Sequence, residues 1–159
     1  MRPEPTPPLL PGWLSLALFV LLVLGGGTVI AMTFVPGDWY ATLEKPFFTP
    51  PNWLFGPVWS LLYVMIAVAG WRTWQRSPAG LPMQVWFGQL ALNFMWTSVF
   101  FGLHQPALGF LVIVIMVALI ILFMRLTWNH DRVSAVLFMP YLAWTAFAAV
   151  LNGGIWGLN

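Results

Sequence analysis

Apolar residues are concentrated in five long runs, with short polar or proline-rich breaks between them. The runs cover about residues 13–35, 53–74, 82–103, 106–127 and 133–155. A helix needs about 20 consecutive apolar residues to cross the hydrocarbon core of a bilayer, so each run is close to a spanning length. The pattern predicts an all-α membrane protein built as a bundle of five transmembrane helices.

The segments outside these runs predict how the bundle is connected. The breaks near residues 77–82, 104–106 and 129–132 are short, so consecutive helices should lie antiparallel and side by side. Residues 1–12 hold five prolines and predict a flexible tail, which leaves residues 13–159 as a single transmembrane domain. The alternative for the first run is a cleaved signal peptide. The run contains only a weak match to a cleavage site and continues beyond it, which argues against cleavage.

The longest break, the 36–52 loop, is unusually rich in proline and aromatic residues. Because proline lacks a backbone donor and restricts the residue before it, no helix should cross residues 45–51. Long loops are usually lids, binding loops or disordered segments, and high aromatic content argues against disorder. We expect a lid that packs on a flat apolar partner. The alternative is an aromatic belt at the bilayer surface.

Composition supports a membrane location and excludes several kinds of function. The chain is 60% hydrophobic and only 6% charged, whereas a soluble domain carries about 25% charged residues. The net charge of +2 is too small and too scattered for nucleic-acid binding. Since there is no cysteine, disulfides, thiolate metal sites and cysteine nucleophiles are excluded.

The basic residues predict an orientation in the membrane. Cytoplasmic loops carry an excess of Lys and Arg, and all but one basic residue fall on the same side as the N terminus: Arg2, Arg72, Arg76, Arg125 and Arg132, against Lys45 alone. We therefore expect a cytoplasmic N terminus, with the 36–52 loop and the C terminus on the outer side.

Three helices should bring aromatic and amide side chains to one depth beneath the loop. With that topology and a helical rise of about 1.5 Å per residue, the outer halves of helices 2, 3 and 5 hold Trp59, Tyr63, Asn93, Trp96, Phe100, Trp144, Ala148 and Asn152. This convergence predicts a binding site. The alternatives are packing for the aromatic residues and Ala148, and interhelical hydrogen bonds for the amides, which we favour for Gln89.

Other chemistries lack the residues that they need. His104 and His130 should lie at opposite ends of the bundle, roughly a membrane thickness apart, so we expect no metal site. There is no paired-carboxylate site in the membrane, no nucleophile beside a base and no glycine loop for phosphate. The glycines at 25–27 lie inside an apolar helix, where Gly27 and Ala31 favour close helix packing.

Three stretches together resemble the TspO, or translocator protein, family of tryptophan-rich sensory proteins. They are WYATLEKPFFTPPNWLFGPVWSLLY at 39–63, QLALNFMWTSVFF at 89–101 and PYLAWTAFAAVLN at 140–152. The resemblance covers nearly the whole chain after the tail. It implies a five-helix bundle, commonly a homodimer, with a pocket capped by the loop between helices 1 and 2.

The resemblance also implies ligands and site residues. Relatives bind protoporphyrin IX, haem, and isoquinoline carboxamide or benzodiazepine drugs. The family's ligand-binding positions fall on Trp39, Trp53, Trp59, Tyr63, Asn93, Trp96, Phe100, Trp144, Phe147, Ala148 and Leu151. A light-dependent breakdown of protoporphyrin, assigned to some bacterial members, is tied to the tryptophans that match Trp59 and Trp144.

This sequence departs from the family at three places. Phe47 and Phe48 stand where some bacterial relatives carry tryptophan. Residues 149–159 lack the Tyr and the Lys or Arg of the sterol motif of animal members. On helix 3, Gly88 has Leu92 and Gln84 at the four-residue spacing where the family's dimer face uses small residues.

Two functions remain open from the sequence. The first is a protein of the bacterial cell membrane that binds tetrapyrroles for sensing or transport and requires no cofactor. The second is a porphyrin-degrading enzyme that uses the indoles of Trp59 and Trp144. A channel or transporter with a polar path is a third, disfavoured by the lack of charge within the spans.

Overall fold

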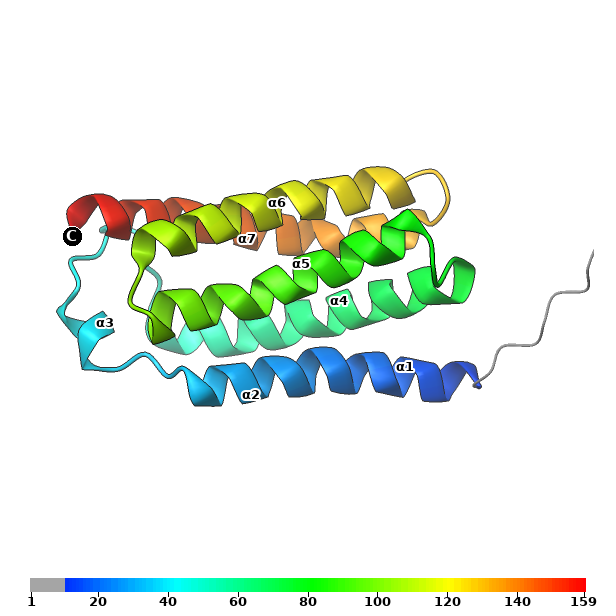
Figure 1. Cartoon of the computed structure of the whole chain (residues 1–159), viewed down its shortest axis with the longest axis horizontal. Helices are drawn as coiled ribbons and strands as arrows, with labels where there is room; N and C mark the ends of the chain where they lie inside the picture. Colours follow the sequence, from blue (N-terminus) through cyan, green and yellow to red (C-terminus); the bar gives the residue numbers. More distant parts are fainter. Residues whose placement is uncertain (1–10) are drawn as a thin grey trace, which may run out of the picture.

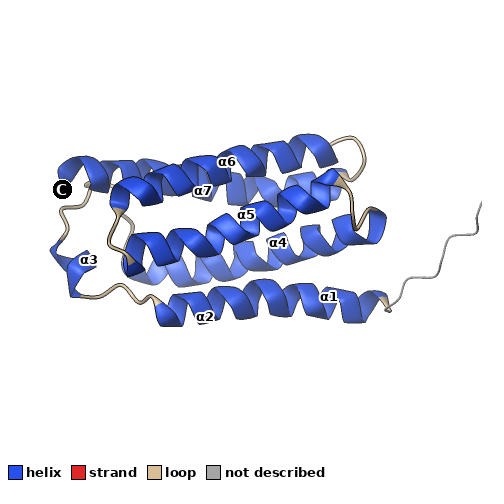
Figure 2. Cartoon of the chain, in the orientation of Figure 1, coloured by secondary structure: helices blue, strands red, loops and turns tan. Residues whose placement is uncertain are grey.

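The structure is a computed structural model that describes residues 11–159. The expected tail therefore falls, for residues 1–10, outside the described part of the chain. Within residues 11–159 all regular elements are helical (Figure 2). Four segments are long and apolar enough to cross a membrane, namely Gly12–Thr33, Asn52–Arg76, Pro106–Thr127 and Arg132–Leu158. The all-α membrane class predicted from the sequence is confirmed.

Five long helical segments make up the bundle. The first combines α1 (Gly12–Val20), a π-helical stretch (Leu21–Gly25) and α2 (Gly26–Thr33). The second is a 3₁₀ turn (Asn52–Leu54) followed by α4 (Phe55–Arg76), and the third is α5 (Leu81–Thr97) with a second π-helical stretch (Ser98–Gly102). The last two are α6 (Pro106–Thr127) and α7 (Arg132–Leu158), and the short α3 (Asp38–Thr42) lies in the 36–52 loop.

The helices form a closed ring of neighbours around a common core. The α1–α2 segment lies beside α4, α4 beside α7, α7 beside α6, and α6 beside α5; α2 contacts α5 and closes the ring (Figure 1). The first helix begins at the end of the bundle opposite to the C terminus (Figure 1). We call the end that holds α3 and the C terminus the chamber end, and the other the arginine end.

Proline residues mark where several helices begin or cannot continue. Pro106 is the first residue of α6 and Pro82 lies in the first turn of α5, positions where the missing N–H would have no helical partner. Residues 43–51 form no helix, as the prolines predicted. By contrast α7 remains helical through Pro140.

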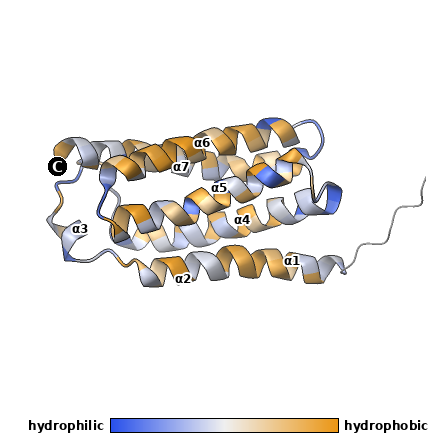
Figure 3. Ribbon diagram, viewed as in Figure 1, coloured by the Kyte–Doolittle hydropathy of each residue, from blue (hydrophilic) through white to orange (hydrophobic). Residues whose placement is uncertain are grey.

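Figure 3 shows that apolar residues predominate along the helices and that hydrophilic residues gather toward the two ends of the bundle. The α6 segment is the most apolar of the four candidate spans, with a mean hydropathy of 3.2. Leu111, Val114 and Ile115 on α6 are all exposed large apolar side chains. Lipid tails are a suitable environment for such a surface, because they leave no apolar side chain in contact with water.

Close packing fills the interior at the arginine end. Trp86 is fully buried, and its Nε1 donates a hydrogen bond of 3.0 Å to the carbonyl of Ile66. The absence of a side chain at Gly70 makes room for the Trp86 ring. Nearby, the rings of Phe123 and Phe138 lie 4.2 Å apart. Side chains leave little free space here.

An ion-pair cluster closes this end. Arg72 Nη2 lies 2.8 Å from Asp131 Oδ1 and Arg76 Nη1 lies 3.0 Å from Asp131 Oδ2, while the Ser134 hydroxyl donates to the same carboxylate at 2.6 Å. Burial raises the pKa of Asp131, but hydrogen bonds from Arg72 and Ser134 and the two guanidinium charges outweigh it and hold the pKa below its usual range. The cluster joins α4 to the start of α7.

Gly88, which was discussed above for a possible dimer face, packs against another helix of the same chain. A Cβ at this position would lie 3.3 Å from Cδ1 of Leu119 on α6. The small residue thus lets α5 and α6 approach each other in the same protomer.

Candidate binding chamber

A cavity of about 670 Å³ lies inside the bundle at its chamber end. It is bordered by α2, α4, α5, α6 and α7 and by the 36–52 loop. Its wall includes Leu24, Gly27, Thr28, Ala31, Met32, Phe34, Val35, Pro36, Tyr40, Asn52, Phe55, Gly56, Trp59, Ser60, Tyr63, Asn93, Trp96, Thr97, Phe100, Phe101, Ile113, Met116, Trp144, Ala148, Leu151, Asn152 and Ile155. The volume falls within the range of about 300–1,000 Å³ that is typical of small-molecule sites.

Aromatic rings from three helices form much of the wall. Trp96 stacks on Phe100 with ring centroids 5.2 Å apart and an interplanar angle of 22°. Trp59 lies against Tyr63 at 5.4 Å, on the same face of α4. The ring of Trp144 on α7 meets Phe55 edge-on at 5.7 Å. Flat apolar faces therefore border the cavity from α4, α5 and α7.

A chain of hydrogen bonds connects three helices beside the cavity. The Tyr63 hydroxyl donates to Asn93 Oδ1 at 3.0 Å, and Asn93 Nδ2 donates to the Tyr141 hydroxyl oxygen at 3.1 Å. Tyr141 in turn donates to Gln89 Oε1 at 2.9 Å. Gln89 is fully buried and, as favoured from the sequence, forms an interhelical hydrogen bond. Asn93 forms interhelical hydrogen bonds and also borders the cavity.

A second amide fixes the orientation of one wall tryptophan. Trp96 Nε1 donates to Asn152 Oδ1 at 3.0 Å, and Asn152 Nδ2 donates to the carbonyl of Pro106 at 2.8 Å. Asn152 is almost completely buried, so these bonds form in a low-dielectric environment where unpaired polar groups are costly. They hold α5, α6 and α7 together at the chamber end.

The 36–52 loop covers the cavity with α3 and turns its tip outward. Tyr40 on α3 is buried and borders the cavity. Burial raises the pKa of the Tyr40 phenol, which therefore stays neutral at physiological pH. Phe47 is completely exposed and Trp53 is 71% exposed. The loop thus has one part that covers the cavity and another that faces the surroundings, where aromatic residues suit an interface.

The loop is attached to the end of α7. The backbone N–H of Glu44 donates to Asn159 Oδ1 and Asn159 Nδ2 donates to the Glu44 carbonyl, both at 3.0 Å. Pro46 packs against Gly154, where a Cβ would lie only 2.6 Å from the proline Cγ. These contacts hold the loop over the cavity.

The structure brings most of the predicted site residues to this one cavity. Eight of the eleven border it: Trp59, Tyr63, Asn93, Trp96, Phe100, Trp144, Ala148 and Leu151. All eight come from the chamber-end halves of α4, α5 with its π-helical stretch, and α7. Seven of them, all except Leu151, are also among the residues that helix depth and spacing predicted to converge.

The other three predicted residues lie outside the cavity wall. Trp39 stacks on the His104 ring at 4.3 Å and meets Phe100 edge-on at 5.7 Å. Trp53, on the 3₁₀ turn before α4, is mostly exposed. Phe147 packs between Phe48 and Trp144, at 6.2 and 5.7 Å. Trp39 and Phe147 therefore support wall residues from behind, through Phe100 and Trp144.

The first helix contributes wall residues that the sequence analysis did not select. Gly27 and Ala31 were interpreted only as helix-packing residues; Gly27 does pack closely, against Tyr63, but both also border the cavity. Phe55 and Tyr40 were missed as well. An apolar helix with small residues carries no periodic aromatic signal, so its role depends on which helices lie beside it.

The chemistry of the wall is apolar, aromatic and uncharged. None of the described residues that border the cavity is Lys, Arg, Asp, Glu or His. Trp144 Nε1 is buried, and none of the described residues accepts its hydrogen; the other two buried polar atoms without a partner, Gln89 Nε2 and Thr145 Oγ1, belong to residues that do not border the cavity. A multi-pass helical membrane protein with an internal aromatic chamber is the class that this fold and site define.

Comparison with known proteins places this chain within a family of that class. A model of the TspO/MBR family matches residues 17–157. The chain is 43% identical over 123 residues to the tryptophan-rich protein TspO of Archaeoglobus fulgidus, with 76% of this chain and 80% of that protein covered. It is 38% identical to protein CrtK of Rhodobacter capsulatus, with 89% of each covered, and 34% identical to the human translocator protein, with 94% and 92% covered. The chain belongs to the TspO/MBR family.

Proposed function

We propose that the chamber binds a flat tetrapyrrole, protoporphyrin IX or haem, for sensing or transport. The observation that carries this proposal is the set of indole faces of Trp59, Trp96 and Trp144 around one uncharged cavity of about 670 Å³. Aromatic rings favour offset stacking on another π-system. An apolar wall with few polar groups is the usual design of a site for a flat, water-averse ligand.

The carboxylates of such a ligand would have to lie at the mouth. Charge inside the chamber would be costly, since its wall offers no cation. Lys45 is the one cation of the described chain at this end, and its ammonium lies 4.6 Å from the centre of the Tyr40 ring. The ligand is then oriented with its macrocycle between the indoles and its acidic edge toward the loop. Haem and the metal-free porphyrin would both be held by stacking.

A titration with matched tryptophan variants tests the proposal. Protoporphyrin IX is added to detergent-solubilised wild type, Trp144→Leu and Trp53→Leu, and binding is followed by quenching of tryptophan fluorescence. Loss of the chamber indole should weaken binding by at least about fivefold, since one aromatic contact contributes roughly 1 kcal/mol beyond its area. Loss of the exposed indole should change affinity by less than about twofold. Equal effects in both variants would argue against binding in the chamber.

The second candidate function is light-dependent porphyrin breakdown, which one arrangement favours. Trp59 and Trp144 border the same cavity from adjacent helices. An indole there would give one electron to the excited porphyrin and take one back after dioxygen has added across a carbon–carbon bond at a methine bridge; that bond would break, its two carbons would become carbonyls, and dioxygen would be the oxidant. Illumination of wild type and of Trp59→Phe with Trp144→Phe, in air and under argon, tests this. Bleaching that survives the double substitution would reduce the tryptophans to binding residues.

The loop over the chamber should act as a lid on the ligand. Tyr40 covers the cavity, and the contacts of Glu44 and Pro46 with α7 hold the loop in place. Bound porphyrin would add a further apolar surface beneath it. We expect saturating protoporphyrin to slow proteolysis within residues 39–53. The same cleavage rate with and without ligand would contradict a lid.

We further propose a cytoplasmic N terminus in the bacterial cell membrane. The described arginines, Arg72, Arg76, Arg125 and Arg132, belong to the end of the bundle where α1 begins, and Lys45 belongs to the other. Reporter fusions at residues 40 and 78 should report the outer side and the cytoplasm, respectively. A homodimer, expected from the family, stays a prediction; the mass of the protein in nanodiscs would test it.

A further inference from the structure

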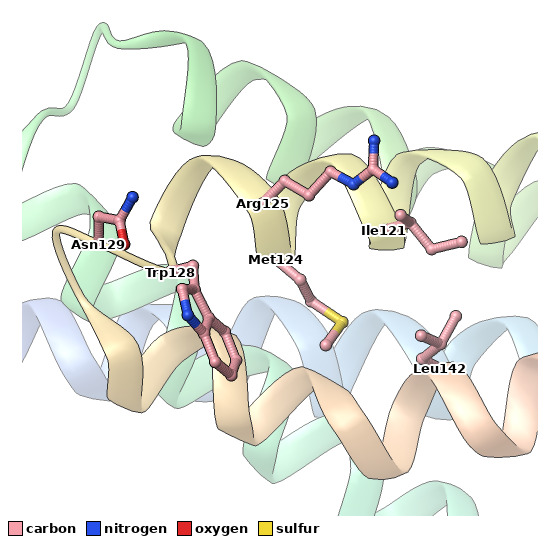
Figure 4. A pocket seen from close by; sticks show the side chains of 6 residues that line it. All are labelled: Ile121, Met124, Arg125, Trp128, Asn129 and Leu142. Atoms are coloured by element: carbon pink, nitrogen blue, oxygen red, sulfur yellow. The ribbon is translucent and has the colours of Figure 1, made fainter.

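A second recess lies at the arginine end, between the end of α6 and the first half of α7. It has a volume of about 330 Å³ and is lined by Ile121, Met124, Arg125, Trp128, Asn129 and Leu142 (Figure 4). It shares no lining residue with the aromatic chamber. Its wall combines apolar side chains with one cation, one indole and one amide, which is a different chemistry from the uncharged chamber.

Arg125 is the charged group of this recess, and its charge is not neutralised within residues 11–159. The single acidic side chain that the described chain holds at this end, Asp131, is occupied by Arg72 and Arg76. Arg125 has neither an ion pair nor a hydrogen bond to any described residue, and its side chain is exposed. Figure 4 shows it extending along α6 in the direction of Ile121. Within the described residues the guanidinium is therefore available to pair with an external anion.

The position of Arg125 along the helix indicates which anion is available. Arg125 lies two residues before the end of α6, which is the most apolar candidate span. At a rise of about 1.5 Å per residue, its Cα lies within one turn of the helix end, and an arginine side chain is long enough to reach a headgroup layer at that end. Basic pockets between transmembrane helices at this level bind the headgroups of anionic lipids.

The rest of the recess suits the remainder of a lipid. Ile121, Met124 and Leu142 form an apolar floor between α6 and α7 that an acyl chain can follow toward the membrane centre (Figure 4). Trp128 lies at the end of α6, where indoles anchor proteins at the membrane interface. Arg132 covers its ring, with the guanidinium carbon 4.8 Å from the ring centre. This contact places a second positive charge next to the recess.

We propose that this recess is a binding site for one anionic membrane phospholipid, with the phosphate on Arg125 and an acyl chain over the apolar floor. Asn129 supplies a further hydrogen-bonding group at the headgroup level. The site lies in the leaflet at the arginine end and acts independently of the chamber. A zwitterionic lipid would fit the floor but would leave the guanidinium charge only partly balanced.

Native mass spectrometry with a matched charge variant tests the proposal. The full chain is released from micelles that contain equal amounts of phosphatidylglycerol and phosphatidylcholine, and retained lipid is counted. Wild type should retain the anionic lipid preferentially. Arg125→Gln should lower that preference about fivefold, the factor expected for one basic residue at an anionic surface.

Arg76→Gln is the control because it removes the same charge at the same end of the bundle. Arg76 lies on α4, away from the recess, and Arg72 remains on Asp131 in that variant. It should retain the wild-type preference. An equal loss in both variants, or no preference in wild type, would overturn the proposal. So would binding of inorganic phosphate that depends on Arg125 without any retention of phosphatidylglycerol, since the recess would then bind a free anion only.

A labelling experiment on wild type makes the test independent of how the variants fold. Phosphatidylglycerol with a photoreactive group in its acyl chain is incorporated into nanodiscs with the protein and illuminated, and the labelled peptides are mapped. Label should concentrate on residues 121–142. Label spread evenly over all helices, or concentrated elsewhere on the bundle, would overturn the assignment.

Discussion

Two tryptophans, one at each end of the bundle, lie in opposite environments. At the arginine end, Trp86 is fully buried, its Nε1 donates to the Ile66 carbonyl, and Gly70 accommodates its ring. At the chamber end, Trp144 borders a cavity, and its buried Nε1 has no acceptor among the described residues. One indole completes a packed core, whereas the other borders a cavity and keeps a buried donor without an acceptor among residues 11–159.

The same helices therefore contribute to stability at one end of the bundle and to binding at the other. Close packing and the Asp131 cluster at one end hold the bundle together. The other end can therefore contain a cavity, although the side chains that line a cavity lose dispersion contacts. Substitutions at the arginine end should therefore change unfolding, and substitutions at the chamber end should change affinity.

The largest expected effect is at the packed end. Trp86→Ala would remove a fully buried side chain and leave the Ile66 carbonyl without that donor, and a buried Trp→Ala change costs about 3–5 kcal/mol of stability. Thermal unfolding in detergent measures it. Trp53→Ala, at a side chain 71% exposed, is the control and should cost less than about 0.5 kcal/mol. Similar losses in the two variants would remove the distinction between the ends.

Ala148→Leu should have its main effect on binding. Ala148 borders the chamber, so three added carbons would occupy ligand space. Overpacking of this kind costs about 1–3 kcal/mol, which corresponds to a loss of roughly 5- to 150-fold in porphyrin affinity. The melting temperature without ligand should stay close to that of wild type. Ala146→Leu, at an exposed position of the same helix, should leave both affinity and melting unchanged; unchanged affinity in Ala148→Leu would place this residue in helix packing instead.

Two glycines provide a direct comparison of the ends. A Cβ at Gly70 would overlap the Trp86 ring, and a Cβ at Gly27 would overlap the Tyr63 ring. Trp86 has no free space around it, so Gly70→Ala should lower stability by about 1–3 kcal/mol. Tyr63 borders the chamber and can turn into it, so Gly27→Ala should cost less stability but reduce porphyrin affinity. The reverse order of the two stability losses would contradict the comparison.

The smallest expected effect concerns the pH dependence of the arginine end. Because the pKa of Asp131 is lowered in the folded protein, its carboxylate contributes stability above the unfolded value of 3.8, and this contribution is lost as the pH falls through the folded pKa. Asp131→Asn should therefore cost about 1–2 kcal/mol at pH 7, where partly exposed arginines limit the loss. It should also flatten the decline of melting temperature below about pH 4. Asp38→Asn, at an exposed loop position, should keep the wild-type profile.

The predicted site illustrates which signals along a chain are reliable. Asn93, Trp96 and Phe100 share a helical face at spacings of three and four, and all border the chamber. Such periodicity is a reliable signal because the side chains on one face of a straight helix all meet the same neighbour. Trp39 lies in the short α3 and Trp53 in the 3₁₀ turn, at the two ends of a loop where no period relates a residue to the cavity. Their positions depended on how the loop folds back on α7.

Sequence alone determined the helical membrane class and the convergence of aromatic residues at one depth, because the bilayer restricts both helix length and polarity. Only the tertiary structure decided that α2 closes the chamber with Gly27 and Ala31, that Phe147 lies behind Trp144, and that Arg125 is left without an acidic partner among residues 11–159. These facts depend on which helices become neighbours. Which helices become neighbours depends on packing between side chains far apart in the sequence. Hydrophobic periodicity along one helix does not indicate which helices lie beside it.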